Sequence, residues 1–354
     1  MHIDNFYDQT VDINNKKQTA KIDAFLKANG LSYEQVEYTV QVVNQNNKIV
    51  GTGSVTGKIL RCFAIDPEYR ETDVFSIVMT HLLNYLSEKG VYHSFVFTKP
   101  GTSQSFRNLG FKEIERAAPL FVLMEQGVGG LKRYQGYLKR NSFKDQEGKK
   151  IGACIVNCNP FTLGHLYLIE KAAKQLDYLY IIVVQENLSV FPFDVRFDLV
   201  KKGTNHLKNV SRIRGGEYVV SSSTFPTYFV KNEDPGEIER LQAEMDLRIF
   251  CKHIAPILGV TKRMVGTEDY CKTTTAYNEA MTRVLPQFGI DIEIVPRKKL
   301  NDDMVISASH VRRGIKDGNW DLVEQLVPKT TMKFLKSKKA IPIIEKIKNY
   351  YSRH

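Results

Sequence analysis

Short apolar runs alternate with amphipathic stretches throughout the second half of the chain. The runs predict buried strands at 151–157, 178–184, 209–214, 262–266 and 291–295. The stretches between them repeat apolar residues every three or four positions, which predicts helices at 165–176, 194–206, 237–251, 273–285 and 308–317. This alternation is typical of an α/β fold with a doubly wound parallel sheet, whose ligands bind at the carboxyl ends of the strands.

The first part of the chain has a different order of elements. Its pattern predicts an α+β domain around a mostly antiparallel sheet. The expected elements are a helix at about 16–28, paired strands around 46–48, a strand near 58–65, a helix from about 73 to 88, a strand at 92–98, a short helix at 102–109 and final strands.

A basic stretch, "LKRYQGYLKRNSFKDQEGKK" at 131–150, interrupts the apolar periodicity between these two parts. Segments of this kind commonly mark domain boundaries. We therefore expect an α+β domain at 1–130, a basic linker at 131–150, a doubly wound (Rossmann-like) domain at 151–327 and a basic tail at 328–354.

The net charge of +11 is concentrated in the linker and the tail. Residues 131–150 contain seven Lys or Arg against two Asp or Glu, and residues 328–354 contain eight against one. A nucleic-acid footprint is more often a continuous basic stripe with interleaved aromatic residues. We therefore expect no nucleic-acid partner and interpret both segments as solvated, with an acidic protein partner as the second interpretation.

The composition, 42% hydrophobic over 354 residues, is that of a globular protein with room for two domains. No apolar stretch approaches the roughly 20 residues of a membrane span, and the first residues lack the order of a secretory signal. We expect a cytoplasmic protein with no membrane partner. The five scattered cysteines do not complete a zinc pattern, so we expect no metal site and interpret them as packing residues.

The candidate chemistry begins where the first strand of the second domain ends, in "NCNPFTLGH" at 157–165. Pro160 restricts the chain there, and Gly164 has no side chain where the next helix begins. The first N–H groups of a helix lack internal partners and lie at the positive end of its dipole, so they can hold an anion. His165 can add a hydrogen bond to a phosphate oxygen. A purely structural turn, with the histidine as a cap, is the alternative.

Other strand ends and helix starts also suit a nucleotide. Small polar residues follow one strand, and a serine cap precedes arginine by one turn, which can clamp phosphate. These residues are Gly266, Thr267 and Glu268 in "VGTED", Ser307, Ser309, Arg312 and Arg313 in "ISASHVRR", and Arg196 on the helix after the second strand. Two helix starts with arginines around one crevice suit a nucleoside triphosphate.

The passage from "CFAIDPEYR" (62–70) to "FRNLGF" (106–111) resembles the Gcn5-related acetyltransferase superfamily in its order of strand, turn, long helix and strand. That family holds the pyrophosphate of coenzyme A on a basic, glycine-rich turn. Here the turn at 69–74 has no glycine and carries Glu71 and Asp73. We therefore expect an acetyltransferase-like domain that transfers no acetyl group to amines and that holds a pantetheine-like arm weakly or serves in docking.

The second domain resembles the nucleotidyltransferase superfamily with the HxGH signature, and within it the citrate lyase ligases, also called acetate:SH-citrate lyase ligases. The resemblance is carried, in the family's order, by "NPFTLGHLYLIEKAA", "STFPTYFVK" (223–231), "VGTEDYC…YNEAM" and "ISASHVR". An acetyltransferase-like domain ahead of it also fits. Thr162 stands where many superfamily members have the first histidine and adds no positive charge, so His165 and the arginines must supply more of the electrostatics.

The resemblance implies an ATP-dependent ligase. Acetate attacks the α-phosphorus of ATP, giving acetyl-adenylate and pyrophosphate, and the phosphopantetheine-type thiol on the acyl carrier subunit of citrate lyase then takes the acetyl group and releases AMP. Mg²⁺ would arrive on the ATP, because the motifs lack enough aspartates for a metal cage. The resemblance implies that His165 and Thr162 bind the α-phosphate, and that Ser307, Ser309 and Arg312 bind the β- and γ-phosphates. Gly266, Thr267 and Glu268 would line the nucleoside, and Asn159 would contact acetate or phosphate. Further nucleotide contacts are implied for Phe161, Gly164 and Arg196.

Two other functions remain open at this point. An adenylyltransferase that makes a dinucleotide-type cofactor from a phosphomonoester explains "NPFTLGH" equally well but leaves the first domain unexplained. A non-catalytic protein that senses a nucleotide and docks an acidic carrier explains the basic segments. Acetate-dependent release of pyrophosphate separates the three functions.

Overall fold

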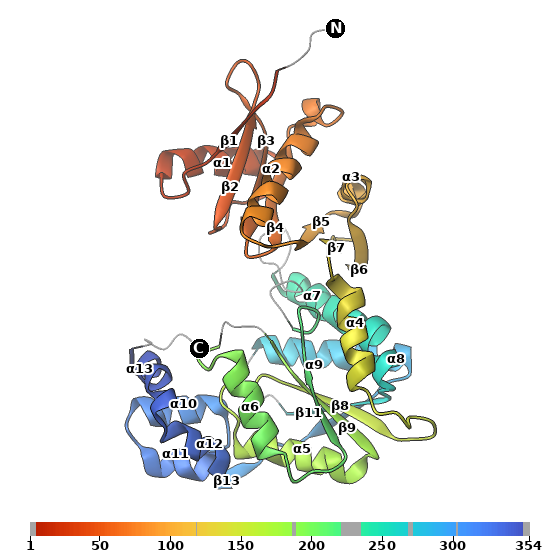
Figure 1. Ribbon diagram of the computed structural model, residues 1–354, viewed down its shortest axis with the longest axis vertical. Coiled ribbons are helices and arrows are strands. Elements are labelled where there is room, and N and C mark those ends of the chain that lie inside the picture. The colour runs from red at the N-terminus through yellow and green to blue at the C-terminus, as the bar shows by residue number, and fades with distance from the viewer. Residues whose placement is uncertain are drawn as a thin grey trace. The chain divides into compact units, whose positions relative to one another are not determined.

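The computed structural model describes residues 5–117, 119–185, 189–220, 235–267, 272–301 and 304–349. The chain forms two compact units, and each is built around its own sheet (Figure 1). One unit contains residues 1–133 and 223–245, and the other contains 134–222 and 246–354.

The first unit contains a seven-stranded sheet in the order β1-β2-β3-β4-β5-β7-β6. Its strand pairs are antiparallel except for the parallel pair β4 and β5. The expected α+β domain with a mostly antiparallel sheet is therefore confirmed. Its elements are β1 (Tyr7–Thr10), α1 (Lys16–Ala28), β2 (Tyr38–Val43), β3 (Ile49–Thr56), β4 (Ile59–Ile65), α2 (Val74–Glu88), β5 (His93–Thr98), α3 (Ser103–Asn108), β6 (Lys112–Ala117) and β7 (Phe121–Gly127).

Helix α2 lies close against the sheet because β3 presents glycine to it. A Cβ atom on Gly51 would lie 2.5 Å from Val74 Cγ1, and one on Gly53 would lie 2.8 Å from Leu82 Cδ1. Val74, Val78 and Leu82 are completely buried in this contact. Removing the side chains from the strand thus lets the apolar side of the helix pack directly on the backbone.

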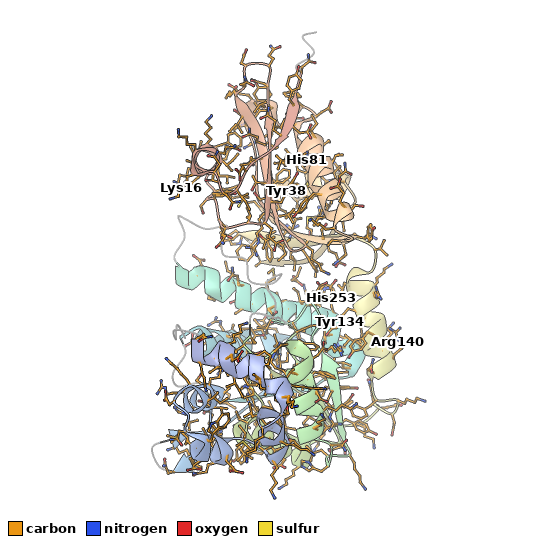
Figure 2. The ribbon with its side chains drawn as sticks, turned by 60° about the vertical axis from the view of Figure 1, so that its left-hand side comes forward. Lys16, Tyr38, His81, Tyr134, Arg140 and His253 are labelled. Atoms are coloured by element: carbon orange, nitrogen blue, oxygen red, sulfur yellow. The ribbon has the colours of Figure 1, made fainter. Side chains whose placement is uncertain are left out.

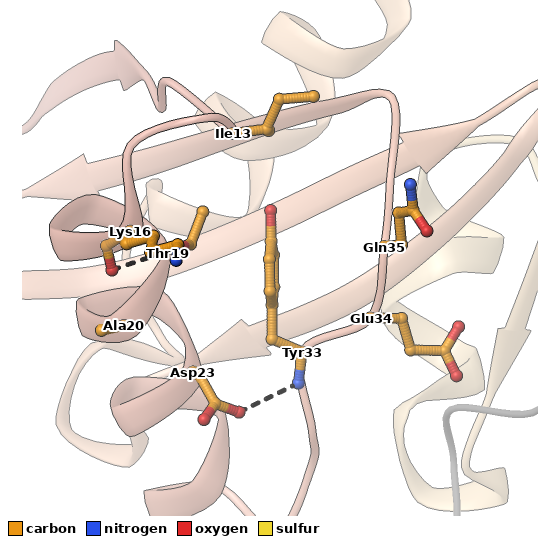
Figure 3. A pocket seen from close by; sticks show the side chains of 8 residues that line it. All are labelled: Ile13, Lys16, Thr19, Ala20, Asp23, Tyr33, Glu34 and Gln35. Atoms are coloured by element: carbon orange, nitrogen blue, oxygen red, sulfur yellow. Dashed lines mark hydrogen bonds between the residues drawn. The ribbon is translucent and has the colours of Figure 1, made fainter.

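Two hollows lie on the first unit. One of about 590 Å³ lies beside α1, where the Tyr33 N–H donates to Asp23 Oδ1 at 3.3 Å (Figure 3). The other, of about 440 Å³, lies beside α2, where His81 Nε2 is 2.5 Å from the Tyr38 hydroxyl (Figure 2). His81 also hydrogen-bonds Asp8, which lowers the pKa of that carboxyl group and ties β1 to α2. Neither hollow involves the motifs of the second domain.

The second unit contains a five-stranded parallel sheet in the order β10-β9-β8-β11-β12. The expected doubly wound sheet is confirmed, and all five of its predicted strands are present. The strands are β8 (Ile151–Val156), β9 (Tyr178–Val183), β10 (Val210–Arg214), β11 (Lys262–Gly266) and β12 (Asp291–Val295). The chain starts at β8 and proceeds to one edge before it returns to β11, so the order of strands reverses between β8 and β11. Ligands of such sheets bind at this point, outside the carboxyl ends of the strands.

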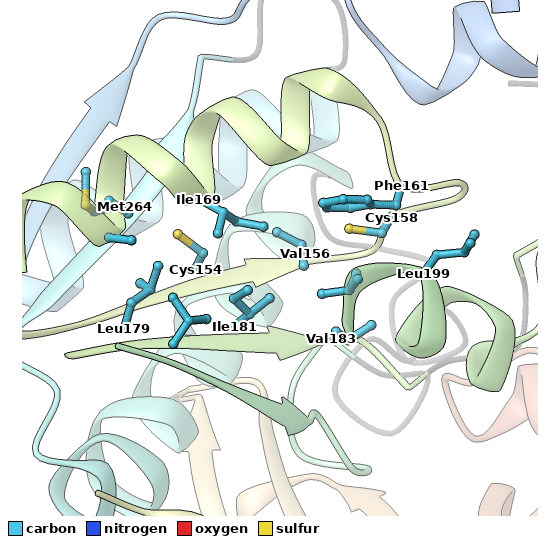
Figure 4. Packing of buried hydrophobic residues seen from close by; sticks show 14 of the residues in the cluster. Cys154, Val156, Cys158, Phe161, Ile169, Leu179, Ile181, Val183, Leu199 and Met264 are labelled. Atoms are coloured by element: carbon cyan, nitrogen blue, oxygen red, sulfur yellow. The ribbon is translucent and has the colours of Figure 1, made fainter. Parts of the chain in front are cut away.

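Helices cover both faces of this sheet. On one face, Cys154, Leu179, Ile181 and Met264 pack with Ile169 of α5 (Figure 4). On the opposite face, the ring of Phe250 lies under the guanidinium group of Arg263, which belongs to β11. The helices of this unit are α5 (Leu163–Gln175), α6 (Phe193–Gly203), α8 (Ala255–Leu258), α9 (Lys272–Val284), α10 (Ala308–Lys316), α11 (Trp320–Leu326), α12 (Lys329–Leu335) and α13 (Ile341–Asn349). Two more helices contain residues of both units: α4 (Gly130–Asn141) lies mostly in the second unit, and α7 (Pro235–Ile249) lies mostly in the first.

The basic segment at 131–150 is not a solvated linker over its first half, because it forms α4. Tyr134 and Leu138, one turn apart, are buried, whereas Arg140 is exposed (Figure 2). The Tyr134 hydroxyl donates to the Arg214 carbonyl at the end of β10 at 3.0 Å. The prediction of a solvated linker was wrong because it considered the many charged residues and overlooked two apolar residues at helical spacing.

The basic tail at 328–354 is folded as well. Helices α12 and α13 bury Met332, Leu335, Ile343 and Ile347 in a cluster with the buried face of α10 and α11. The lysines that interrupt these apolar positions lie on the exposed side of the helices. The expectation of a solvated tail is therefore wrong, because the apolar residues recur at helical spacing between the charges.

The described cysteines, Cys62, Cys154, Cys158 and Cys251, are free and buried. Burial raises the pKa of Cys62 and Cys251 to about 11 and that of Cys154 to about 12, so these thiols are protonated packing residues, as expected. None of the helices in the described part of the chain combines the length and apolar character that crossing a bilayer requires.

Candidate active site

The turn between β8 and α5 is held by three distant segments of the second unit. Its Asn159–Pro160 peptide bond is cis. The Asn159 side chain accepts a hydrogen bond from the Phe191 N–H at 3.0 Å, and the Asn159 carbonyl accepts one from Arg312 Nη1 at 2.5 Å. Thr331 of α12 donates to the Phe161 carbonyl at 3.0 Å. The loop before α6, the start of α10 and the C-terminal helix α12 therefore all meet at the sequence motif.

Thr162 and His165 form a reciprocal cap at the start of α5. The Thr162 side chain accepts a hydrogen bond from the His165 N–H at 3.3 Å, and the Thr162 N–H donates to His165 Nδ1 at 3.1 Å. Because Nδ1 accepts this bond, the proton of the neutral ring lies on Nε2. The imidazole is thus fixed with a single ring donor, Nε2–H, available for another partner. His165 thus fits both interpretations of the motif, because it completes the structural cap and still has a ring N–H that could donate to a phosphate.

Burial, and secondarily the positive charge of Arg297, lowers the pKa of His165 from its ordinary 6.5 to about 4. The ring is therefore neutral near pH 7. We expected His165 and the arginines together to supply the electrostatics that a histidine in place of Thr162 would add, and a neutral ring leaves the positive charge of this pair to the arginines. The histidine can act as a neutral hydrogen-bond donor, and arginine must supply the positive charge.

The roles expected of Thr162 and Phe161 also change. The Thr162 side chain is 1% exposed and its hydroxyl is engaged in the cap, so it positions His165 and does not reach an α-phosphate. Phe161 is completely buried in the core beneath the turn (Figure 4), where its ring stacks on His165 with centroids 6.0 Å apart. Its side chain supports the histidine from below and makes no nucleotide contact.

Arg196 does not contact a phosphate either. Its side chain is completely buried, and its Nη1 donates to the carbonyl oxygens of Asn157 and Val184 at 2.8 and 2.7 Å. Its Nε donates to the Phe191 carbonyl at 3.0 Å. Arg196 therefore joins the carbonyl groups that follow β8 and β9 and holds the edge of the crevice in place. The nucleotide role expected from its residue type is wrong.

Helix α10 brings the second motif to the same place. The Ser307 side chain accepts a hydrogen bond from the His310 N–H at 3.2 Å and so caps the helix, while its own O–H can still donate. Arg312 contacts both Ser309 Oγ, at 3.2 Å, and the Asn159 carbonyl. The structure thus brings Arg312, Ser309 and the β8–α5 turn together, as the sequence predicted. Arg313, the next residue, is exposed.

Gly164 allows this approach of the two helix starts. A Cβ atom at Gly164 would lie 2.6 Å from the Ile306 carbonyl oxygen, which precedes α10. Real Cβ contacts are longer, so any side chain here would push the two segments apart. The glycine is required by the packing of the protein against itself, and not by the bulk of a ligand.

Gly266 and Thr267 lie at the carboxyl end of β11, beside the turn that follows β8. The Thr267 N–H donates to the Val295 carbonyl at 3.0 Å, and Thr267 Oγ1 accepts from the Arg297 N–H at 3.3 Å. These two residues thus lie at the expected edge of the sheet. Glu268 and the segment 223–231 lie outside the described residues. Arg297, at the exit of β12, was missed because no motif marks it.

In the parts of the chain described here, no three His, Cys, Asp or Glu side chains form a group that could hold a metal ion. The turn between β8 and α5 and the neighbouring helix α10 instead carry hydrogen-bond donors: His165 Nε2–H, the first amides of α5, Ser309 and Arg312. Neutral and charged donors around the start of a helix are suited to polyphosphate.

Comparisons with known proteins agree with this architecture. Residues 151–335 match the citrate lyase ligase C-terminal domain family. The chain is 38% identical to the [Citrate [pro-3S]-lyase] ligase of Escherichia coli (strain K12) and 36% identical to that of Klebsiella pneumoniae. These alignments cover 91% of this chain in both cases, and 91% and 94% of the relatives.

A more distant match covers a smaller part of the chain. The phosphopantetheine adenylyltransferase of Corynebacterium efficiens is 23% identical over 156 residues, which are 39% of this chain and 92% of that protein. The ligases, in contrast, match nearly the whole length of both chains. By its sequence, its domain order and the arrangement of its motifs, this chain belongs to the citrate lyase ligase family.

Proposed function

We propose that this protein is an ATP-dependent ligase that acetylates the prosthetic-group thiol of citrate lyase. The observation that carries this proposal is the match to the citrate lyase ligases over 91% of the chain, which includes the first domain. The adenylyltransferase alternative accounts only for the second domain. A non-catalytic sensor is disfavoured because the crevice retains a fixed, neutral histidine donor beside an arginine.

In the first step, a carboxylate oxygen of acetate attacks the α-phosphorus of ATP. The bond from the α-phosphorus to the bridging oxygen breaks, and pyrophosphate leaves with the bonding electrons. Negative charge accumulates on the non-bridging oxygens, where preorganised donors stabilise the transition state. His165 Nε2–H donates to one of these oxygens, and the amides at the start of α5 act in the same direction.

Arg312 and Ser309 hold the β- and γ-phosphates, so that the pyrophosphate is oriented as it leaves. The guanidinium group is already fixed by the Asn159 carbonyl and by Ser309, and therefore loses little conformational freedom when the nucleotide binds. Mg²⁺ bound to the triphosphate would neutralise further charge. Asn159, whose side-chain oxygen and carbonyl are both engaged, orients the turn, and its amide N–H groups can still donate to acetate or phosphate.

In the second step, the sulfur of the phosphopantetheine-type thiol on the acyl carrier subunit attacks the acetyl carbonyl carbon. The bond from this carbon to the phosphate oxygen breaks, AMP leaves, and the thiol proton passes to solvent. The products are AMP and the acetylated carrier. The enzyme contributes orientation in this step, because acetyl-adenylate is itself an activated acyl group.

Acetate-dependent release of pyrophosphate from ATP tests the proposal. The assay is followed by addition of deacetylated citrate lyase, and we expect both the release of AMP and the return of lyase activity. Release that requires a phosphomonoester in place of acetate would identify an adenylyltransferase. ATP binding without release in all of these conditions would identify a sensor.

A further inference from the structure

Arg297 lies in the candidate active site although no motif of the sequence includes it. Its backbone N–H donates to Thr267 Oγ1 at 3.3 Å, which joins the exit of β12 to the exit of β11. The next residue, Lys298, accepts a hydrogen bond at its carbonyl from the Ile306 N–H at 2.9 Å. The Ile306 carbonyl in turn abuts Gly164 in the first turn of α5. Arg297 is therefore held between the end of β11 and the start of α5.

The side chain of Arg297 extends from β12 over the end of β11. Its Cγ atom lies 3.8 Å from the position that a Cβ atom would take on Gly266. Because Gly266 is paired with Val295 in the sheet, this contact directs the stem of the arginine across β11 and toward β8. The absence of a side chain at Gly266 keeps this path open. Arg297 is only half-buried at this position.

The direction of the Arg297 side chain agrees with the effect of its charge on the pKa of His165. The charge of Arg297 contributes to lowering the pKa of His165, which stands at the start of α5 beyond the end of β8. Burial lowers the pKa of Arg297 itself, but an arginine stays protonated in this environment. A guanidinium group thus acts on the same region as His165 Nε2–H, on the side of the crevice formed by β11 and β12.

We infer that Arg297 is a substrate-binding residue that contacts the α-phosphate of the nucleotide, opposite Arg312. The inference rests on the proposed function for the identity of the reaction but needs only nucleotide binding for its test. The two arginines then have different partners. Arg312 binds the pyrophosphate that leaves, and Arg297 binds the phosphate whose phosphorus is attacked. This arrangement also accounts for a neutral His165, because Arg297 supplies the charge that the histidine lacks.

The test compares Arg297→Met, Arg297→Lys and the control Lys298→Met, which removes an exposed positive charge from the adjacent residue. Calorimetry measures binding of adenosine, AMP and ATP to the full chain. Loss of a charge-assisted hydrogen bond should weaken AMP and ATP binding by about tenfold to a hundredfold in Arg297→Met, with adenosine unaffected. Arg297→Lys should recover part of this loss, and Lys298→Met should bind all three ligands normally.

Two further readouts separate a substrate contact from a structural role. The pKa of His165, followed by NMR in the absence of ligand, should rise in Arg297→Met and not in Lys298→Met. Acetate-dependent pyrophosphate release should fall by roughly 10²-fold or more in kcat. Normal AMP affinity in Arg297→Met, or a loss confined to ATP, would overturn the inference. If the wild-type protein binds AMP but releases no pyrophosphate with acetate, the proposed function fails while the binding test of Arg297 still stands.

Discussion

At the scale of single residues, the site depends on a histidine whose two ring nitrogens have different tasks. Nδ1 of His165 accepts from the Thr162 N–H and completes the cap of α5, and in the proposed mechanism Nε2–H donates to the substrate. Burial keeps this ring neutral. A histidine at this helix position can therefore be a structural cap and a catalytic donor at once, and the two roles can be separated by mutation.

His165→Gln keeps the cap and removes the ring donor. Glutamine at this position can accept from the Thr162 N–H through its side-chain oxygen as in an ordinary capping box, but its amide N–H groups are not held in the plane and direction of the ring Nε2–H. We expect kcat for acetate-dependent pyrophosphate release to fall by roughly 10²–10³-fold, with little change in ATP affinity. Thermal melting checks that the fold is retained. His165→Ala should show the same loss of rate and a lower melting temperature. Near-normal turnover of a folded His165→Gln variant would mean that His165 is only a cap.

The pH dependence of stability should also reveal His165. Its pKa is about 4 in the folded protein against 6.5 ordinarily, so the unfolded chain binds more protons between these values. Stability from this residue is therefore fully present above about pH 6.5 and is lost as the pH falls toward 4. Urea denaturation at several pH values should show a steeper loss in the wild type than in His165→Gln. Parallel profiles for the two proteins would contradict the low pKa.

Arg196 offers a contrasting residue, because its interactions are entirely internal. Arg196→Met would leave the carbonyl groups of Asn157, Val184 and Phe191 without this donor. Each buried unsatisfied polar group costs about 1–3 kcal/mol, so we expect a loss of about 3 kcal/mol or more in the free energy of unfolding. Lys202→Met, on the exposed side of the same helix, should change it by about 0.5 kcal/mol or less. A stable Arg196→Met variant with weak ATP binding would restore the nucleotide role.

At the scale of elements, the site is the meeting of two helix starts at the reversal of a parallel sheet. The first turn of α5 approaches the chain before α10 because Gly164 has no side chain, and Arg312 and Thr331 then hold the turn from the other side. Helix α12 is therefore part of the support of the site. Helices α5, α10 and α12 are far apart in the sequence, and they must pack together before His165 and Arg312 are brought close to each other.

This arrangement makes the C-terminal helices essential. A chain that ends after Val327 loses the apolar contacts of α12 and α13 and the hydrogen bond from Thr331 to the Phe161 carbonyl. We expect it to unfold at a clearly lower temperature and to lose pyrophosphate release. A chain that ends after Asn349, which keeps every described helix, serves as the control. An active and equally stable truncated chain would show that α12 and α13 do not support the turn.

At the scale of the whole molecule, the positive charge is concentrated outside the sheet of the second unit. The basic segments form helices whose apolar positions are buried and whose lysines are exposed. Lys333, Lys336 and Lys339 are therefore presented on a folded surface rather than on a loose chain. A fixed basic surface is better suited to steering an acidic partner than a disordered tail, because its geometry is preorganised.

Neutralising the exposed lysines of this surface should separate the two half-reactions. The variant replaces Lys333, Lys336, Lys338 and Lys339 by glutamine and leaves the buried residues unchanged. Pyrophosphate release with acetate should stay normal. Transfer of the acetyl group to the citrate lyase carrier should slow at low salt and lose its dependence on ionic strength. Unchanged transfer at low salt would show that this surface does not guide the carrier.

The sequence by itself determined the elements and the family. Alternation of apolar residues depends on local periodicity, so the strands and helices of both domains were predicted close to their observed bounds. The motifs "NPFTLGH" and "ISASHVR" depend on residue type and spacing, and the structure places them side by side. The folded nature of the basic segments was also present in the spacing of Tyr134 and Leu138, but the charge run obscured it.

Only the tertiary structure decided what each residue of the site does. Arg196 and Arg297 are the same residue type, yet the first is directed to internal carbonyl groups and the second to the crevice. Direction and burial depend on neighbours that are distant in the sequence, such as Asn157 for Arg196 and Ile306 for Gly164. Local sequence carries no record of these contacts, because they arise only when the sheet has brought its strand ends together.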